Sequence, residues 1–297
     1  MSSDLLEEVS LPGRTRTQAR THGRLPTFLI IGAAKAGTTS LAEYLSEHPQ
    51  VFVAPEKEIN YFDRHHGHGP DWYRARFAGA GDASAVGEAS PAYMYFDDAL
   101  ARMADLVPNA KLVAILRDPV ERLYSDYWYR RPLGETRSFA EVVRQEIAEG
   151  TPFHKTMRMG YLEVGRYVTH LRRVCEHFPR ESLLVLLMDD LRSDPAGTFA
   201  SLCRFIGVDD AFRPPSLGRP TNEAYSLRWP ALRRTMWRLR LGKRARWLAK
   251  RLDDLNRVPL NKPAMDPALR AELKAWYASD NAELAEWLGR DLSAWSS

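Results

Sequence analysis

Hydrophobic residues in this chain form short continuous runs separated by longer, mixed segments. Runs rich in Val, Ile and Leu predict strands at residues 27–32, 85–88, 111–116 and 183–188. Such runs are typical of a parallel sheet that is covered on both faces. The segments around them predict helices at residues 38–47, 70–77, 97–106, 120–130, 138–149, 163–178, 195–206 and 267–288.

This alternation predicts an α/β fold, a single domain with a central parallel sheet flanked by helices and a P-loop-like architecture. Ligands of such folds bind at the carboxyl ends of the strands. The chain shows no internal repeat, low-complexity tract or linker, so we expect one domain over residues 25–297. Residues 1–24 are polar and basic, and we expect a disordered tail there.

Composition narrows the class of protein. With 297 residues and 44% hydrophobic content the chain can bury a sizeable core, and its net charge of +4 is too small to indicate a nucleic-acid partner. It has no apolar run long enough to span a membrane, and its first residues lack the apolar core of a signal sequence. Cys175 and Cys203 fall in predicted helices and are too few for a disulfide framework. We therefore expect a cytoplasmic protein with two reduced thiols.

One basic segment differs from the rest of the chain. Residues 228–251 contain ten Lys or Arg and no acidic residue, interleaved with Trp229, Trp237 and Trp247. Such a segment fits peripheral contact with an anionic membrane or an acidic acceptor. The alternative is a solvated basic helix whose tryptophans pack inward.

The strongest chemical signal follows the first predicted strand. Phe28-Leu-Ile-Ile-Gly32-Ala-Ala-Lys35-Ala-Gly37-Thr38-Thr39-Ser40 resembles a phosphate-binding loop, whose helix-start N–H groups would cradle a phosphate. Gly32 and Gly37 have the spacing of the motif G-x-x-x-x-G-K-[ST], but Thr38 takes the place of the lysine. The lysine lies inside the loop instead, at Lys35, which indicates chemistry other than triphosphate hydrolysis.

A second signal ends the strand at residues 111–116. Asp118 followed by Pro119 predicts a helix start, which places Arg117 at the carboxyl edge of the sheet. A guanidinium there can bind a phosphate through two hydrogen bonds, and Ser125, two turns into the helix, can add a hydroxyl.

With these motifs the chain resembles the sulfotransferases that use 3′-phosphoadenosine 5′-phosphosulfate (PAPS) as donor. It is most similar to the bacterial and Golgi-type carbohydrate branch, which includes enzymes of heparan sulfate. The resemblance rests on Lys35-Ala-Gly-Thr-Thr-Ser40, Glu58-Ile-Asn-Tyr-Phe-Asp63, Gly87-Glu-Ala-Ser-Pro-Ala-Tyr93, Leu116-Arg-Asp-Pro119, Gly165-Arg-Tyr167, residues 183–195 and Leu288-Gly-Arg-Asp-Leu-Ser-Ala-Trp295.

The resemblance implies a role for each matching residue. Lys35 and the loop backbone would hold the 5′-phosphosulfate, and Lys35 would stabilise the leaving phosphate; the loop residues are Ala36, Gly37, Thr38, Thr39 and Ser40. Arg117 and Ser125 would hold the 3′-phosphate, with a late contact from Arg219 in a loop that also contains Asn222. The resemblance implies no metal.

The resemblance also implies a base for the acceptor hydroxyl, and Glu58 matches that position. The histidine usual two residues later is replaced by Asn60, and a basic residue of the heparan sulfate enzymes is replaced by Ala89. His65, His66 and His68 are expected in a mobile loop over the acceptor mouth, where one of them is an alternative base rather than a zinc ligand.

Two other functions remain open at this point. A P-loop kinase or nucleoside triphosphatase would use Asp189 with magnesium at the end of the strand at residues 183–188. A non-catalytic membrane-surface protein would depend on residues 228–251. For the sulfotransferase, the acceptor is a hydroxyl of a carbohydrate, lipid or other small molecule. The aromatic residues Tyr124, Tyr127, Trp128 and Tyr129 fit either core packing or a face for that acceptor.

Overall fold

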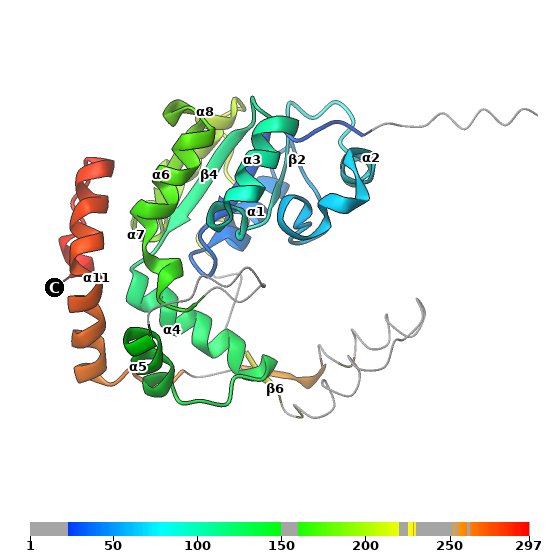
Figure 1. Ribbon diagram of the computed structural model, residues 1–297. Helices are drawn as coiled ribbons and strands as arrows, with labels where there is room; N and C mark the ends of the chain where they lie inside the picture. The colour runs from blue at the N-terminus through cyan, green and yellow to red at the C-terminus, as the bar shows by residue number, and fades with distance from the viewer. Residues whose placement is uncertain are drawn as a thin grey trace, which may run out of the picture.

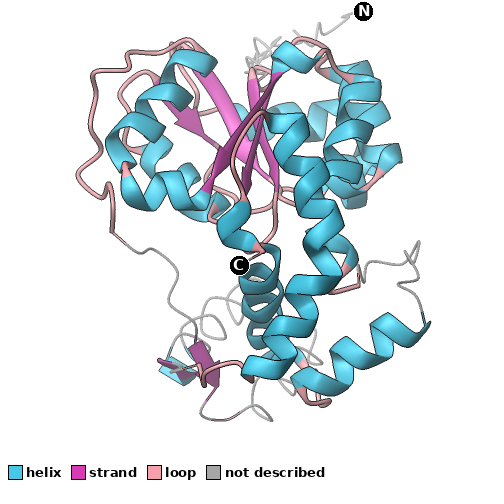
Figure 2. Cartoon of the chain, turned by 90° about the vertical axis from the view of Figure 1, so that its left-hand side faces the viewer, coloured by secondary structure: helices cyan, strands magenta, loops and turns pink. Residues whose placement is uncertain are grey.

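Five parallel strands form the centre of the protein. The computed structural model describes residues 23–149, 160–219, 225–227, 229, 252, 255–259 and 262–296. The sheet has the order β2-β3-β1-β4-β5, and helices lie on both of its sides (Figure 2). The strands are β1 (Phe28–Gly32), β2 (Val51–Val53), β3 (Ala85–Ala89), β4 (Lys111–Leu116) and β5 (Leu183–Leu187).

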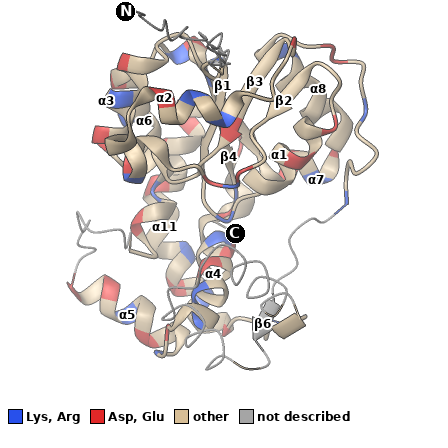
Figure 3. Cartoon of the chain, turned by 90° about the vertical axis from the view of Figure 1, so that its right-hand side faces the viewer, with Lys and Arg blue, Asp and Glu red and all other residues tan. Residues whose placement is uncertain are grey.

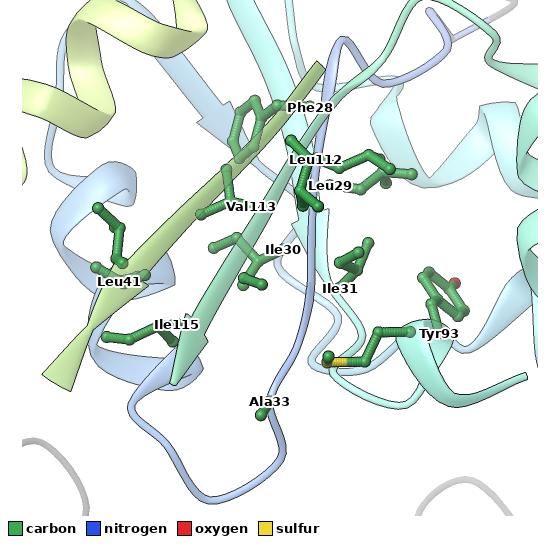
Figure 4. Close-up of a cluster of buried hydrophobic side chains, with 14 of the residues drawn as sticks. Phe28, Leu29, Ile30, Ile31, Ala33, Leu41, Tyr93, Leu112, Val113 and Ile115 are labelled. Atoms are coloured by element: carbon green, nitrogen blue, oxygen red, sulfur yellow. The ribbon is translucent and has the colours of Figure 1, made fainter. Parts of the chain in front are cut away.

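The middle strand is buried along its whole length, as its continuous apolar sequence predicts. Leu29 lies opposite Glu88 of β3 and Leu112 of β4, and residues 28–31 have no exposed surface. Figure 4 shows the side chains of β1 and β4 packed together, with Ala33 at the start of the loop that leaves β1. The α/β fold with a covered parallel sheet is confirmed.

Helices surround this sheet in the order expected, and Figure 1 labels most of them. Their bounds are α1 (Thr38–Ser46), α2 (Pro70–Arg74), α3 (Asp97–Leu106), α4 (Pro119–Arg130), α5 (Phe139–Glu149), α6 (Tyr167–His177), α7 (Met188–Ser193), α8 (Pro195–Ile206) and α11 (Pro267–Leu288). Three of them begin with an Asp–Pro pair, at Asp118, Asp194 and Asp266. Each aspartate accepts hydrogen bonds from first-turn N–H groups, as predicted at Asp118.

Several predicted boundaries differ from those in the structure. The strand predicted to residue 188 ends at Leu187 because Met188 begins α7. The helix predicted over residues 163–178 is a 3₁₀ turn (Glu163–Gly165) followed by α6, since Arg166 leaves helical geometry between them at φ −81° and ψ 65°. Strand β2 and the antiparallel pair β6 (Tyr225–Leu227) and β7 (Arg257–Pro259) were not predicted, because three residues are too few to form a hydropathy pattern.

A second apolar cluster lies beside the sheet and joins α4 to the C-terminal helix. Tyr277 of α11 is fully buried and donates a hydrogen bond to the carbonyl of Leu162 at 2.8 Å. Helix α11 also lies along α6 (Figure 1). The cluster includes Val120, Leu123, Val142, Val143, Leu269 and Leu273. The C-terminal helix therefore braces α4, the helix that follows Arg117.

The structure bears on three expectations from composition: the state of the thiols, membrane-spanning helices and the N-terminal tail. Cys175 lies in α6 and Cys203 in α8, and both are free thiols. In the part of the chain that the structure describes, no helix combines the length and the apolarity that crossing a membrane requires. Residues 1–22 of the predicted tail lie outside the described residues, and Arg24 donates a hydrogen bond to the carbonyl of Ala83 at 2.8 Å.

Close packing at the centre of the sheet gives a test of this core. A methyl group added at Gly87 of β3 would lie 2.4 Å from the ring of Phe28, its partner in β1. We expect Gly87→Ala to lower the free energy of unfolding by about 1–3 kcal/mol, measured by urea denaturation. Gly67→Ala is the matched control, because nothing lies within 4 Å of the added methyl. Equal stability of the two variants would contradict the packing of Phe28 over Gly87.

Candidate functional site

Hydrogen bonds from its first two residues anchor the loop between β1 and α1. The N–H of Ala33 donates to the carbonyl of Ile115 at 2.8 Å, and that of Ala34 donates to the hydroxyl of Tyr95 at 3.3 Å. Gly37 precedes the helix at φ 112°, a left-handed conformation that favours glycine. The first turn of α1 contains no acidic residue. The loop therefore has the form of an anion-binding helix start.

Lys35 is held over helix α4. Its backbone has φ 69°, which is uncommon for a residue other than glycine, and its Nζ lies 3.9 Å from the ring centroid of Tyr129. Burial lowers the pKa of Lys35 to about 8, against the opposing effect of the Asp126 carboxylate. The charges of Lys262 and Lys57 lower that pKa further. The amine is thus directed into the protein, as the resemblance requires.

Asp126, which the sequence analysis did not select, is the principal opposing charge. It is buried on α4 between Arg130, whose Nη2 lies 2.7 Å from Oδ2, and Arg122, whose Nη1 lies 3.5 Å from the same atom. Arg122 is fully buried and also donates to the carbonyl of Tyr161. The two arginines fix the carboxylate that acts on Lys35. The spacing of Arg122, Asp126 and Arg130 at i, i+4 and i+8 was the available sequence signal.

Arg117 lies at the carboxyl end of β4, where it was predicted. Its side chain is 18% exposed and pairs with Glu121 at 3.3 Å. Its buried Nε has no hydrogen-bond partner among the described residues. Burial and the nearby charge of Arg192 on α7 lower the pKa of Arg117. A guanidinium that keeps an unused buried donor is suited to a further anionic partner.

Ser125 is joined to a residue from the distant C-terminal part of the chain. The Nζ of Lys262, which follows β7, donates to Ser125 Oγ at 3.4 Å. Tyr124 holds this segment by donating to the carbonyl of Pro263 at 2.8 Å. Burial lowers the pKa of Lys262, and the charge of Arg117 lowers it further. The sequence analysis missed Lys262 because no local motif marks it.

Three cations thus share one region at the carboxyl edge of the sheet. Lys262 links the other two, because its charge lowers the pKa of Lys35 and the charge of Arg117 lowers the pKa of Lys262. Figure 3 shows Lys and Arg residues at the end of β4 and along α4. A ligand with several negative charges is the chemical complement of this arrangement.

Glu58 is the second charged residue that the resemblance brings to Lys35. It is exposed, with φ 53°, in the segment that follows β2. Its carboxylate raises the pKa of Lys35 and that of Asp63, so the structure brings Lys35 and Glu58 into one site, as the resemblance implies. The role of Glu58 as a base stays a prediction.

Asp63 is a second carboxylate beside Glu58, and the sequence analysis assigned it no role. Its side chain is 6% exposed, and neither oxygen has a hydrogen-bond partner among the described residues. The Nε of Arg64 lies 3.5 Å from Oδ2. Burial raises the pKa of Asp63 to about 6, and Glu58 contributes to this rise. Asp63 therefore exchanges a proton near neutral pH next to the predicted base.

The three histidines lie in short helical turns, whereas their mobility and their place over the acceptor mouth stay predictions. Tyr61–His65 forms a π-helical turn and His66–His68 a 3₁₀ turn. The imidazole of His68 stacks on Trp72 at 4.8 Å, and His65 lies 5.7 Å from the same indole. These ring contacts hold the segment in a regular conformation. Within the described ranges, no group of three or more His, Cys, Asp or Glu could hold a metal ion.

The other candidates divide between structural and unassigned roles. Asp189 accepts a hydrogen bond from the indole of Trp295 at 2.8 Å, and Asp190 pairs with Arg290. Both carboxylates after β5 thus hold the C-terminal part of the chain, which favours a structural role over binding of magnesium. Arg219 is exposed. Its backbone N–H donates to the carbonyl of Ser216, and its carbonyl accepts a hydrogen bond from the Tyr44 hydroxyl. Asn222 lies outside the described residues.

Two of the aromatic residues of α4 differ in exposure, and the role of either in binding an acceptor stays a prediction. Tyr127 is 3% exposed and belongs to the core beside α4, whereas Tyr129 is 45% exposed and lies beneath Lys35.

A covered parallel sheet with an anion-binding loop after its central strand defines a protein of the P-loop-like α/β class. Within that class, a model of the sulfotransferase domain matches residues 25–214, and the chain belongs to the sulfotransferase family.

Individual relatives agree with this assignment. The chain is 30% identical over 295 residues to the bifunctional heparan sulfate N-deacetylase/N-sulfotransferase 3 of Mus musculus, covering 94% of this chain and 32% of that protein. It is 32% identical to the human heparan sulfate glucosamine 3-O-sulfotransferase 3B1 over 62% of this chain and 47% of that protein. It therefore spans less than half the length of these relatives. A solved sulfotransferase from Alicyclobacillus acidocaldarius covers 92% of this chain and matches over its own entire length, with 29% identity and a TM-score of 0.68.

The buried Asp63 predicts a pH-dependent stability difference. Its pKa is about 6 in the folded protein against an ordinary value of 3.8, so between these values the folded state binds a proton that the unfolded state does not. The cost of burying the charge is therefore complete above pH 6 and disappears as the pH falls toward 4. We expect Asp63→Asn to be more stable than the parent by about 1–3 kcal/mol at pH 8, with a smaller difference at pH 5.

Denaturant titration at several pH values measures this difference. Asp98→Asn is the control, because the Asp98 side chain is 85% exposed and its replacement removes no buried charge. A variant at Asp63 that is less stable than the parent by a constant amount at every pH would contradict the assignment.

Proposed function

We propose that this protein transfers a sulfonate group from PAPS to an acceptor hydroxyl or amine. The observation that carries the proposal is the convergence of Lys35, Arg117 and Lys262 around the loop in a member of the sulfotransferase family. Lys262 experiences repulsion from Arg117 and exerts it on Lys35, and a ligand of high negative charge would offset both effects. PAPS supplies such charge at two separated positions, its 3′-phosphate and its 5′-phosphosulfate.

The two anionic ends of PAPS fit two parts of the site. Lys35 and the backbone amides at residues 36–40 suit the 5′-phosphosulfate, because the helix start directs N–H groups toward it. The 3′-phosphate suits Arg117 and Ser125, together with Lys262, which already contacts the Ser125 hydroxyl. A nucleotide without the 3′-phosphate would offer no anion to Lys262 or to the unused Nε donor of Arg117.

The proposed reaction uses Lys35 and Glu58, whose charges interact. Glu58 takes the proton of the acceptor as its oxygen or nitrogen forms a bond to sulfur. On the opposite side the bond from sulfur to the phosphate oxygen breaks, and 3′,5′-adenosine bisphosphate leaves. Lys35 stabilises the charge that grows on that oxygen, an effect of about 10²–10³ in rate by analogy with one oxyanion donor.

The relatives suggest a class of acceptor. Their names specify N- and 3-O-sulfotransferases of heparan sulfate, so we propose a carbohydrate that bears a hydroxyl or an amine. Asn60 and Ala89 depart from the heparan sulfate pattern, and the Asn60 side chain is buried, so it does not offer a polar group to an acceptor. Lipid and other small hydroxyl compounds therefore remain in the acceptor panel.

The alternative functions and the predicted location have less support than sulfonate transfer. A kinase or triphosphatase needs Asp189 for magnesium, but that carboxylate already binds Trp295. Of the basic segment at residues 228–251, the structure describes only Trp229. Its side chain is exposed, and its backbone N–H donates to Oδ1 of Asn256. Membrane contact through this segment and a cytoplasmic location remain predictions.

Binding of nucleotides tests the donor. We expect calorimetry to show that 3′,5′-adenosine bisphosphate binds at least about tenfold more tightly than AMP, because charge-assisted hydrogen bonds to the 3′-phosphate contribute about 1.5–3 kcal/mol each. Lys262→Met should reduce this preference and leave the affinity for AMP unchanged. Equal affinities for the two nucleotides in the parent protein would refute the proposal. Mass spectrometry with labelled PAPS and a panel of carbohydrates would then identify the acceptor.

The pKa of Lys35 predicts an alkaline limit of activity. Because the free protein loses the Lys35 proton near pH 8, kcat/KM for the donor should fall tenfold per pH unit well above that value. Lys35→Arg is the matched variant, since a guanidinium stays charged and the alkaline limb should disappear even if the overall rate is lower. An unchanged limb in this variant would assign the titration to another group.

A further inference from the structure

Glu88 is a buried carboxylate at the carboxyl end of β3 that the proposed reaction does not use. It is 1% exposed and accepts three hydrogen bonds from hydroxyl groups. Tyr73 and Tyr93 donate to Oε1 at 2.8 and 2.9 Å, and Ser90 donates to Oε2 at 2.6 Å. Burial raises the pKa of Glu88, and the three donors oppose that rise. A carboxylate with this many donors is satisfied, so its position is well defined.

Two of these hydroxyls also hold the backbone of the segment that carries Glu58. The Ser90 oxygen accepts the N–H of Asn60 at 3.0 Å, and the Tyr93 oxygen accepts the N–H of Tyr61 at 2.8 Å. Each hydroxyl has one proton, and its oxygen faces an amide donor, so the proton is directed to Glu88. The carboxylate therefore orients both hydroxyls as acceptors for the segment.

This segment needs such support because its backbone is strained. Glu58 has φ 53° and Asn60 has φ 50°, both in the left-handed region that residues other than glycine seldom adopt. Conformations of this kind persist only where the surroundings hold them in place. Stacking of Tyr61 on Tyr73, with ring centroids 4.4 Å apart, adds a second attachment to the same cluster.

We propose that Glu88 is a positioning residue for the base Glu58, acting through Ser90 and Tyr93 on the backbone at Asn60 and Tyr61. This inference rests on the proposed function for the role of Glu58, but the anchoring of the backbone can be measured without activity. With the carboxylate in place, Glu58 is presented beside Lys35. Without it, the hydroxyls lose their orientation and the segment relaxes.

Amide hydrogen exchange tests the anchoring. In Glu88→Gln the amide group replaces one acceptor oxygen by a donor, so Ser90 or Tyr93 loses its acceptor. We expect protection to fall by about tenfold or more at the amide which that hydroxyl holds, Asn60 for Ser90 or Tyr61 for Tyr93. Tyr73→Phe is the matched control: it removes a hydrogen bond to Glu88 and keeps the ring, but Tyr73 has no hydrogen bond to the segment. In Tyr73→Phe the protection of the Asn60 and Tyr61 amides against hydrogen exchange should stay near that in the parent protein. Unchanged protection in Glu88→Gln would overturn the proposal.

A double-mutant cycle with Glu58→Gln tests the consequence for turnover. Alone, Glu88→Gln should lower kcat by about 10- to 100-fold, with the affinity for 3′,5′-adenosine bisphosphate unchanged, because a small displacement of a reacting group has an effect of this size. In the Glu58→Gln background it should lower kcat by less than about twofold. The same large loss in both backgrounds would show that Glu88 does not act through Glu58, and would overturn the proposal.

Separate outcomes distinguish this inference from the proposed function. A parent protein that transfers no sulfonate and does not prefer the bisphosphate would end the proposed function, and amide exchange would still decide whether Glu88 holds the segment. If Glu88→Gln fails to fold, Ser90→Ala and Tyr93→Phe replace it. Each removes one attachment, so exchange should rise at Asn60 in the first and at Tyr61 in the second. Protection retained at both positions in these variants would overturn the proposal as well.

Discussion

Repulsion of Lys262 by Arg117, and of Lys35 by Lys262, is the constraint around which the site is built. Burial makes it stronger, because like charges interact more in a medium of low polarity than in water. Asp126, which opposes this effect at Lys35, is itself held by Arg122 and Arg130, and Glu121 pairs with Arg270 as well as with Arg117. The cations are thus kept charged enough to bind an anion but are not neutralised. Folding is what holds them in place, and a bound polyanion would relieve the repulsion.

The topology explains how these groups meet. Strands β1 and β4 are neighbours, so the loop after one and Arg117 after the other open at the same edge of the sheet. The Asp–Pro start of α4 turns the chain directly after Arg117, and α4 then carries Ser125, Asp126 and Tyr129 past the loop. On the other side of β1, strand β3 supplies Glu88 next to the segment of Glu58. The central strand is flanked by one neighbour that leads to the proposed donor site and another next to the segment of the proposed base.

Sequence was sufficient where the signal is local. The continuous apolar strands, the glycine spacing of the loop and the Asp118–Pro119 helix start each lie within a few residues, and the structure places Lys35 and Arg117 where these patterns put them. Lys262 could not be found in this way, since it reaches Ser125 across 137 positions and no motif surrounds it. Asp63 and Asp126 matter because of burial, which a sequence does not display. Strand β2 was missed because three residues leave no periodicity, and the histidine segment because its order comes from stacking on Trp72.

The hydrogen bond between Lys262 and Ser125 has a consequence for the timing of biosynthesis. A ribosome makes the loop and Arg117 early, whereas Lys262 emerges after all five strands of the sheet have been translated. If the donor site is built as proposed, a nascent chain that has folded these strands would still lack one of its cations. Preference for a doubly phosphorylated adenosine would then arise later in synthesis than the loop itself, when the segment of Lys262 docks on α4.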